Sequence, residues 1–71
     1  MAVKATIRIE YDIHIQYEDE SGYFFKVTLE GTANEIYGEL CQITRGTLMA
    51  SNAQRAVAYN NEGFDVCSYI K

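Results

Sequence analysis

The sequence predicts a two-layer α+β domain, in which a small antiparallel β-sheet carries one or two helices on one face. Three observations lead to this fold class. Residues 5–17 alternate between apolar and polar side chains, a second alternating run follows a short turn, and the apolar spacing then becomes that of a helix. A chain of 71 residues is short for a domain, so residues 1–71 are expected to form one compact unit. A hairpin and a C-terminal strand give three or four strands.

The first predicted strand has one apolar and one polar face. Alternation of this kind, with β-branched and aromatic residues, is typical of a strand that packs one face against the core and turns the other to solvent. The apolar face is formed by Ala5, Ile7, Ile9, Tyr11, Ile13, Ile15 and Tyr17. The polar face, which is expected to meet water, is formed by Thr6, Arg8, Glu10, Asp12, His14 and Gln16.

A hairpin is predicted to follow. Residues 18–22 read EDESG and predict a turn in which Gly22 supplies a permissive backbone. The second strand is expected over residues 23–30, with alternate apolar residues on the core side. Pairing Tyr17 with Tyr23 brings the two apolar faces together, so this register is predicted.

In this register the hairpin uses residues 11–17 and leaves residues 3–10 without a neighbour. Unpaired strand edges template further pairing, so proteins cover them or use them. The simplest cover is a C-terminal strand over residues 64–70, which would make the first strand central. A second copy of the chain could add a strand at the same edge and form a homodimer.

A helix is predicted after the second strand. Thr32, followed three residues later by Glu35, forms a capping-box pattern just before an apolar run with helical spacing. The helix is expected over residues 33–45 on the inner face of the sheet, with Gly46 as its C-cap.

The segment after Gly46 allows two interpretations. Met49, Ala53 and Val57 have helical spacing but would point away from the first helix's apolar side, so a second helix after a break at Gly46 is preferred. The alternative is that residues 55–59 form a strand, joined through the turn residues 60–63 to the C-terminal strand.

Charge and cysteine content limit the classes of partner and compartment. The net charge is −4, and residues 10–39 hold eight acidic side chains against one base, Lys26. Nucleic-acid binding depends on Lys and Arg, so no direct nucleic acid is expected and a basic protein is the favoured partner. The chain shows no apolar signal-peptide core and no apolar run long enough to cross a bilayer. We expect a cytoplasmic protein with reduced Cys41 and Cys67 and no membrane association.

The residue pattern does not favour an enzyme. His14 is the only histidine and is expected on the solvent-facing side opposite Lys26, where neither a nucleophile nor a pocket surrounds it. Cys41, Cys67 and His14 lack the short ligand spacings of zinc sites, and the glycines form no phosphate-binding loop. No catalytic residue, metal or cofactor is predicted.

Two groups of residues are the candidates for partner binding. The predicted register places like charges opposite each other, which is unfavourable unless a partner uses them. An aromatic pair beside an acidic hairpin tip has the composition of an interaction hot spot for a basic partner. The first group is Glu10, Asp12 and Glu30, and the second is Glu18, Asp19, Glu20, Tyr23 and Phe24. The alternative is an acidic turn that only aids solubility, with one exposed aromatic residue.

Three functions are compatible with these observations. The favoured one is a non-enzymatic acidic binding module that inhibits a basic, nucleic-acid-handling protein, in part as a nucleic-acid mimic. In size and charge only, the chain resembles phage and mobile-element inhibitors such as anti-CRISPR proteins. The second is a homo-oligomeric assembly module joined through strand edges. The third is a small-molecule-binding domain with a pocket between sheet and helices, lined by Tyr11, Tyr17, Tyr23 or Tyr37.

Overall fold

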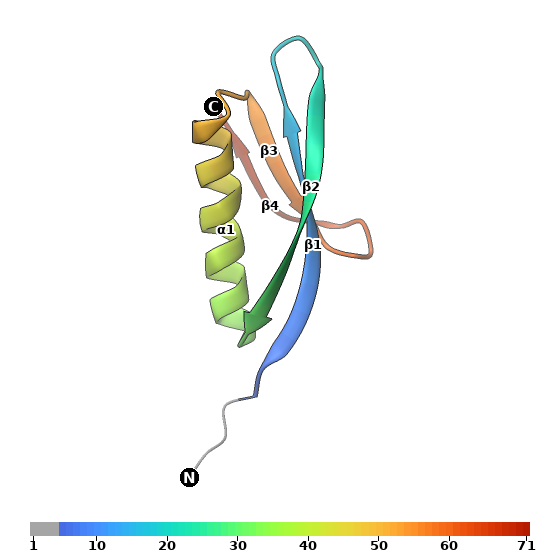
Figure 1. Cartoon of the computed structure of the whole chain (residues 1–71), viewed down its shortest axis with the longest axis vertical. Coiled ribbons are helices and arrows are strands. Elements are labelled where there is room, and N and C mark those ends of the chain that lie inside the picture. Colours follow the sequence, from blue (N-terminus) through green and yellow to red (C-terminus); the bar gives the residue numbers. More distant parts are fainter. Residues whose placement is uncertain (1–4) are drawn as a thin grey trace.

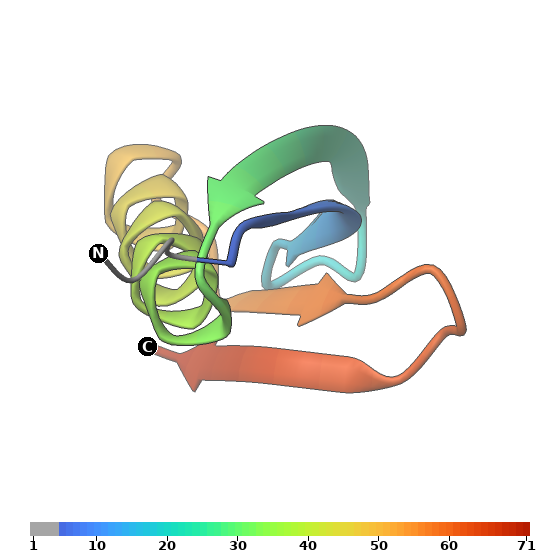
Figure 2. The ribbon, with the colours of Figure 1, turned by 90° about the horizontal axis from the view of Figure 1, so that it is seen from below.

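The computed structural model describes residues 5–71 and confirms the predicted α+β architecture. Within these residues it contains β1 (Ile7–Gln16), β2 (Gly22–Gly31), α1 (Ala33–Ala50), β3 (Arg55–Tyr59) and β4 (Asp65–Ile70). The strands form one antiparallel sheet in the order β2-β1-β3-β4. The helix covers one face of this sheet, and the other face is left open (Figure 1, Figure 2).

The hairpin register differs from the prediction by two residues. Tyr23 pairs with Ile15 instead of Tyr17, and Val27 pairs with Tyr11 instead of Ile13. A shift of two residues keeps every side chain on its face, so the apolar pattern fits both registers equally well. The two registers differ in which polar residues meet on the open face, and the turn geometry selects between them.

The like-charge pair predicted on the open face is therefore wrong. Glu30 lies opposite Arg8, and Glu10 lies opposite Thr28. Glu10 also forms an ion pair with Lys26, with 3.4 Å between Oε1 and Nζ. Both side chains are largely exposed, and such a surface ion pair contributes little stability.

The prediction that the N-terminal half of the first strand has no neighbour is wrong. Strand β2 pairs with β1 over its whole length, Ile7–Gln16, so residues 7–10 have a neighbour on that side. On its other side β1 pairs with β3 over residues 12–16, and β4 lies beyond β3. The predicted cover by the C-terminal strand is therefore wrong, and Val3 and Lys4 of the predicted unpaired segment lie outside the described residues.

The helix is one continuous element, which corrects the prediction of two helices with a break at Gly46. The predicted capping box is present, since the Thr32 side chain accepts from the Glu35 N–H and Glu35 accepts from the Thr32 N–H. The helix ends at Ser51, whose N–H bonds to the Thr47 carbonyl, so Gly46 is not the C-cap. Its core stripe runs in steps of four through Ile36, Leu40, Thr44 and Leu48. Met49, used to predict the second helix, is exposed.

Residues 55–59 form strand β3, which confirms the alternative interpretation. Ala56 and Ala58 point to the helix side and are fully buried, together with Ala53 just before the strand. Alanine side chains leave room for α1 to pack closely on the sheet. In the turn to β4, the Asn60 side chain accepts hydrogen bonds from the Glu62 and Phe64 N–H groups at 2.9 and 3.0 Å.

The core lies between α1 and the inner face of the sheet. Thr44 is its one buried polar residue among those described, and its hydroxyl donates to the Leu40 carbonyl at 2.7 Å. The apolar core is built from Tyr11, Ile13, Ile15, Leu29, Ile36, Leu40, Leu48, Ala53, Ala56, Ala58 and Cys67. No helix within residues 5–71 combines the length and the apolar character that crossing a membrane requires.

Candidate functional site

The open face of the sheet carries a row of side chains that crosses all four strands. Phe24 on β2 lies opposite His14 on β1, His14 lies opposite Val57 on β3, and Val57 lies opposite Ser68 on β4. Alternation places all four on the side away from α1, because their sequence neighbours Ile13, Ile15, Ala56 and Ala58 belong to the core.

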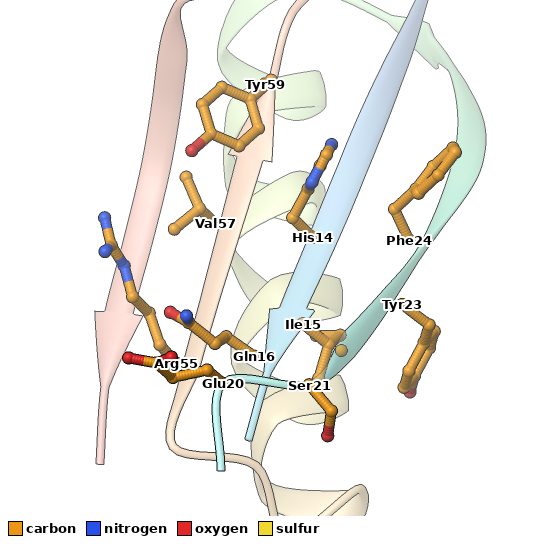
Figure 3. Close-up of a pocket in the computed structure, with 11 residues that line it drawn as sticks. His14, Ile15, Gln16, Glu20, Ser21, Tyr23, Phe24, Arg55, Val57 and Tyr59 are labelled. Carbon is orange, nitrogen blue, oxygen red and sulfur yellow. The ribbon is translucent and has the colours of Figure 1, made fainter. Parts of the chain in front are cut away.

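Three rings are packed together at this part of the open face, two from this row and Tyr59 from the next position on β3. The His14 ring stacks on Phe24, with ring centroids 5.2 Å apart and planes 16° from parallel. The same imidazole and the Tyr59 ring meet in a T-shaped arrangement, with centroids 4.9 Å apart and planes at 79°. These are the two arrangements that aromatic rings prefer. We call Phe24, His14 and Tyr59 the aromatic row (Figure 3).

The aromatic row stands on a buried floor. Val57 is only 3% exposed although it lies on the face without a helix, while Phe24 is 61% exposed. Figure 3 shows the Val57 side chain between Tyr59, His14 and Arg55. Neighbouring side chains therefore shield Val57 from water, whereas Phe24 presents a large exposed ring at the outer end of the row.

The row borders a hollow of about 340 Å³ that is open to solvent. Side chains of both charges reach it, because Glu20 comes from the hairpin tip and Arg55 from the start of β3 (Figure 3). Gln16 and Ser21 add neutral hydrogen-bonding groups. An apolar floor with a few polar groups at the rim suits a side chain or a small planar group inserted from outside.

The structure corrects the expected surroundings of His14. The histidine lies on the open face and on the opposite side of the sheet from Cys41, as predicted, but its partner on β2 is Phe24 and not Lys26. Lys26 lies opposite Asp12, one row further along. The prediction that no pocket surrounds His14 is also wrong, since the hollow is lined by His14 itself.

The three acids of the hairpin tip point to different places. Asp19 holds the turn together, because the N–H and the hydroxyl of Ser21 both donate to its carboxylate, the N–H at 3.0 Å. These hydrogen bonds, the hydroxyl's foremost, lower the pKa of Asp19. Glu20 lines the hollow, whereas Glu18 lines a separate depression beside Lys71. The tip is thus not one acidic cluster.

The turn is built differently from the prediction. The left-handed residue is Glu20, with φ of 70°, and the Glu20 N–H donates to the Tyr17 carbonyl at 3.0 Å. Gly22 serves close approach instead, since a Cβ atom there would lie 2.0 Å from the Ile15 carbonyl oxygen. The turn therefore aims the Glu20 side chain at the hollow while Gly22 lets β2 begin against β1.

The other predicted site residues are only partly gathered. Tyr23 touches the rim of the hollow, but its ring lies on the helix side of β2. Its ring centroid is 6.3 Å from those of both Tyr17 and Phe25. Asp12 lies opposite Tyr59 and so stands next to the aromatic row. Glu10 and Glu30 lie further along the face, away from the hollow. Of the predicted residues, Glu20, Tyr23 and Phe24 line the hollow, and Asp12 lies beside Tyr59 outside it.

Sequence reasoning missed His14, Val57, Tyr59 and Arg55 as members of the site. Tyr59 and Val57 could be placed beside His14 only once residues 55–59 were known to be a strand that pairs with β1. A usable signal was present in the run RAVAY, where an arginine, a valine and a tyrosine alternate with alanines.

The inward tyrosines do not surround an enclosed site in the described residues. Tyr11 belongs to the core, and burial together with the nearby Cys67 raises its pKa. Tyr23 borders a wide groove beside α1, with Ile43, Gly46 and Thr47 on the helix side. No three His, Cys, Asp or Glu side chains within residues 5–71 come together as metal ligands would.

Comparison of the chain with protein-family models, curated protein sequences and solved structures found no significant match.

Proposed function

We propose that the protein is a non-enzymatic binding module that holds a basic protein segment on the open face of its sheet. The observation that carries the proposal is the aromatic row, in which an exposed Phe24 stacks on His14 and the buried Val57 lies on the other side of His14. A ring that is already packed loses little conformational freedom when a partner covers it, and such aromatic residues are favoured as binding hot spots.

Two carboxylates near the row would attract a cationic side chain, while Arg55 lines the same hollow. Asp12 stands next to Tyr59 at one end of the row, and Glu20 lines the hollow at the other. An arginine guanidinium over Phe24 or Tyr59 would gain a cation–π contact and lie close to a carboxylate. The net charge of −4 would also draw a basic partner toward the molecule.

The same charges bear on the nucleic-acid-mimic form of the proposal. Arg8, Lys26 and Arg55 stand among the acids of this face, so a continuous array of negative charge is not formed there. Support is therefore stronger for anchoring of single basic side chains than for imitation of a phosphate backbone. Inhibition of a basic, nucleic-acid-handling protein remains the form of function that the acidic composition favours.

Affinity capture from cells of the native host tests the proposal. The double variant Phe24→Ala/Glu20→Lys removes the exposed ring and reverses the charge at the hollow. We expect the variant to lose at least about 90% of the captured basic partner, which corresponds to about 1.4 kcal/mol of binding free energy. Capture by the unmodified protein should fall as the salt concentration rises, because exposed charges are screened.

The chain offers a matched control on another surface. Phe64 is 65% exposed and Glu62 is exposed, and both lie in the turn between β3 and β4. The variant Phe64→Ala/Glu62→Lys makes the same chemical changes and should retain full capture. Equal capture by both variants, or equal loss in both, would contradict a binding surface at the aromatic row.

A second candidate function is self-association through a sheet edge. Strand β2 is ten residues long and pairs only with β1 in the described part of the chain, so its outer edge is free. Free strands of this length template pairing with another chain. Light scattering over a concentration series should then show a dimer, and a monomer at every concentration would exclude this function.

A further inference from the structure

Two cysteines meet on the side of the sheet away from the aromatic row. Cys41 lies on α1 and Cys67 lies on β4, and their Sγ atoms are 2.6 Å apart although 26 residues separate them in the sequence. Both are free thiols. This distance is shorter than the packing of two unbonded sulfur atoms and only slightly longer than the S–S bond of about 2.05 Å. The two sulfur atoms therefore already lie close to bonding distance.

Two tyrosines flank the thiols in a symmetrical way. Tyr37 lies one helical turn before Cys41, and Tyr69 lies two residues after Cys67, on the same side of β4. The interaction of each hydroxyl group with the Cys41 side chain raises the pKa of both tyrosines. Two thiols and two tyrosines thus come together where α1 packs on β4.

The two thiols differ in accessibility. Cys67 is only 7% exposed, while Cys41 is half-buried and borders the exposed ring of Tyr37. Burial, followed by the hydrogen bond with Cys41, raises the pKa of Cys67 from 9.0 to about 12. Cys67 therefore stays protonated at neutral pH, and a reagent from solution meets Cys41 first.

We propose that Cys41 and Cys67 form a thiol-oxidation site that reacts with low-molecular-weight disulfides and closes to a covalent clasp between α1 and β4. The geometry of the pair carries this inference, and it is independent of the proposed binding function.

The reaction takes place in two exchange steps. The Cys41 thiolate attacks one sulfur of a disulfide RSSR, which breaks the S–S bond, leaves a mixed disulfide on Cys41 and releases one thiolate. Cys67 then gives up its proton as its sulfur bonds to Cys41 Sγ, the bond from Cys41 to the second RS group breaks, and the leaving RS⁻ takes up that proton. In sum, RSSR is reduced to two RSH while the two protein thiols are oxidised to one disulfide.

The clasp would close a long loop of the chain. Residues 41 and 67 bracket the end of α1, all of β3 and the start of β4. A disulfide across a loop of this length strongly restricts the unfolded chain and so stabilises the folded protein. Because the two sulfur atoms are already close, we expect most of this stabilisation to be observed. We expect the melting temperature to rise by about 10 °C or more on oxidation.

Oxidised glutathione is the probe for the test. The native protein is incubated with it and analysed by intact mass spectrometry after alkylation of free thiols. We expect a monomer that has lost the mass of two hydrogen atoms and takes up no alkylating reagent. A stable glutathione adduct on the unmodified protein, or two thiols that still react with the reagent, would overturn the proposal.

Two single variants test the roles of the thiols. Cys67→Ser should stop at a glutathione adduct on Cys41, because no second thiol resolves it. Cys41→Ser should leave the buried Cys67 unreacted in the folded protein. Prompt modification of Cys67 in that variant would contradict the assigned order of attack. If either variant fails to fold, the mass and melting temperature of the oxidised native protein still decide the proposal.

Discussion

His14 of β1 stacks on Phe24 of β2, with ring centroids 5.2 Å apart and planes 16° from parallel. This contact joins the single histidine of the chain to the most exposed ring of the sheet's open face. It converts two residues on a nominally polar face into part of a packed surface, and Tyr59 extends that surface to β3. The binding function proposed above depends on this arrangement.

The stacking predicts an energetic coupling between His14 and Phe24. In a double-mutant cycle with His14→Ala and Phe24→Ala, we expect an interaction energy of about 0.5–1.5 kcal/mol in the free energy of unfolding. Urea denaturation at neutral pH measures it. A cycle of His14→Ala with Phe64→Ala should give no coupling, because Phe64 lies in the turn after β3. Equal coupling in both cycles would show that the stack is not formed.

Gly22 is predicted to be the least replaceable residue of the hairpin. A Cβ atom there would lie 2.0 Å from the Ile15 carbonyl oxygen, so β2 and β1 must separate at the turn. We expect Gly22→Ala to lower the free energy of unfolding by about 2 kcal/mol or more. Thermal or urea unfolding checks this value. Stability equal to that of the unmodified protein would contradict the close approach of the two strands.

Gly46 is predicted to respond in the opposite direction. It lies inside α1 and is exposed, and an added Cβ would meet no atom within 4 Å beyond the local backbone of its own helix. Alanine loses less conformational freedom in a helix, so Gly46→Ala should raise the free energy of unfolding by about 0.5–1 kcal/mol. The same urea experiment measures the gain. A loss of stability would be inconsistent with one continuous helix through residue 46.

The raised pKa of Cys67 predicts a loss of stability in alkaline solution. Between pH 9 and pH 12 the unfolded chain releases the Cys67 proton while the folded protein keeps it. Stabilisation from this site is therefore complete below pH 9 and falls as the pH rises, by up to about 1.4 kcal/mol per pH unit. Under reducing conditions, the free energy of unfolding of the native protein should fall more steeply with pH than that of Cys67→Ala. Parallel pH profiles would contradict the burial of this thiol.

The parts of the fold that could be predicted from sequence are those whose residue pattern fits only one type of secondary structure. Alternation in β1 and β2 and the Thr32–Glu35 capping box fixed the elements and their inner faces. The register could not be predicted, because a shift of two residues matches the same apolar faces. It was set by the turn, where Glu20 takes the left-handed conformation and Gly22 touches Ile15.

The candidate site was harder to predict than the fold. Phe24 could be singled out from its place on a polar face, but its contact with His14 depends on the register, and Tyr59 depends on β3. The spacing of Met49, Ala53 and Val57 suggested a helix, whereas in the sheet the alanines of β3 make room for α1. Tertiary packing therefore decided both the third strand and the surface built on it.

The central claim is that the aromatic row is where a basic segment binds. An NMR titration of the isotope-labelled protein with an arginine-rich peptide tests it most directly, with a glutamate-rich peptide of equal length as the control. We expect the arginine-rich peptide alone to shift the amide signals of His14, Phe24, Val57 and Tyr59. Shifts confined to α1 or to the turn at Phe64, or equal shifts with both peptides, would contradict the claim.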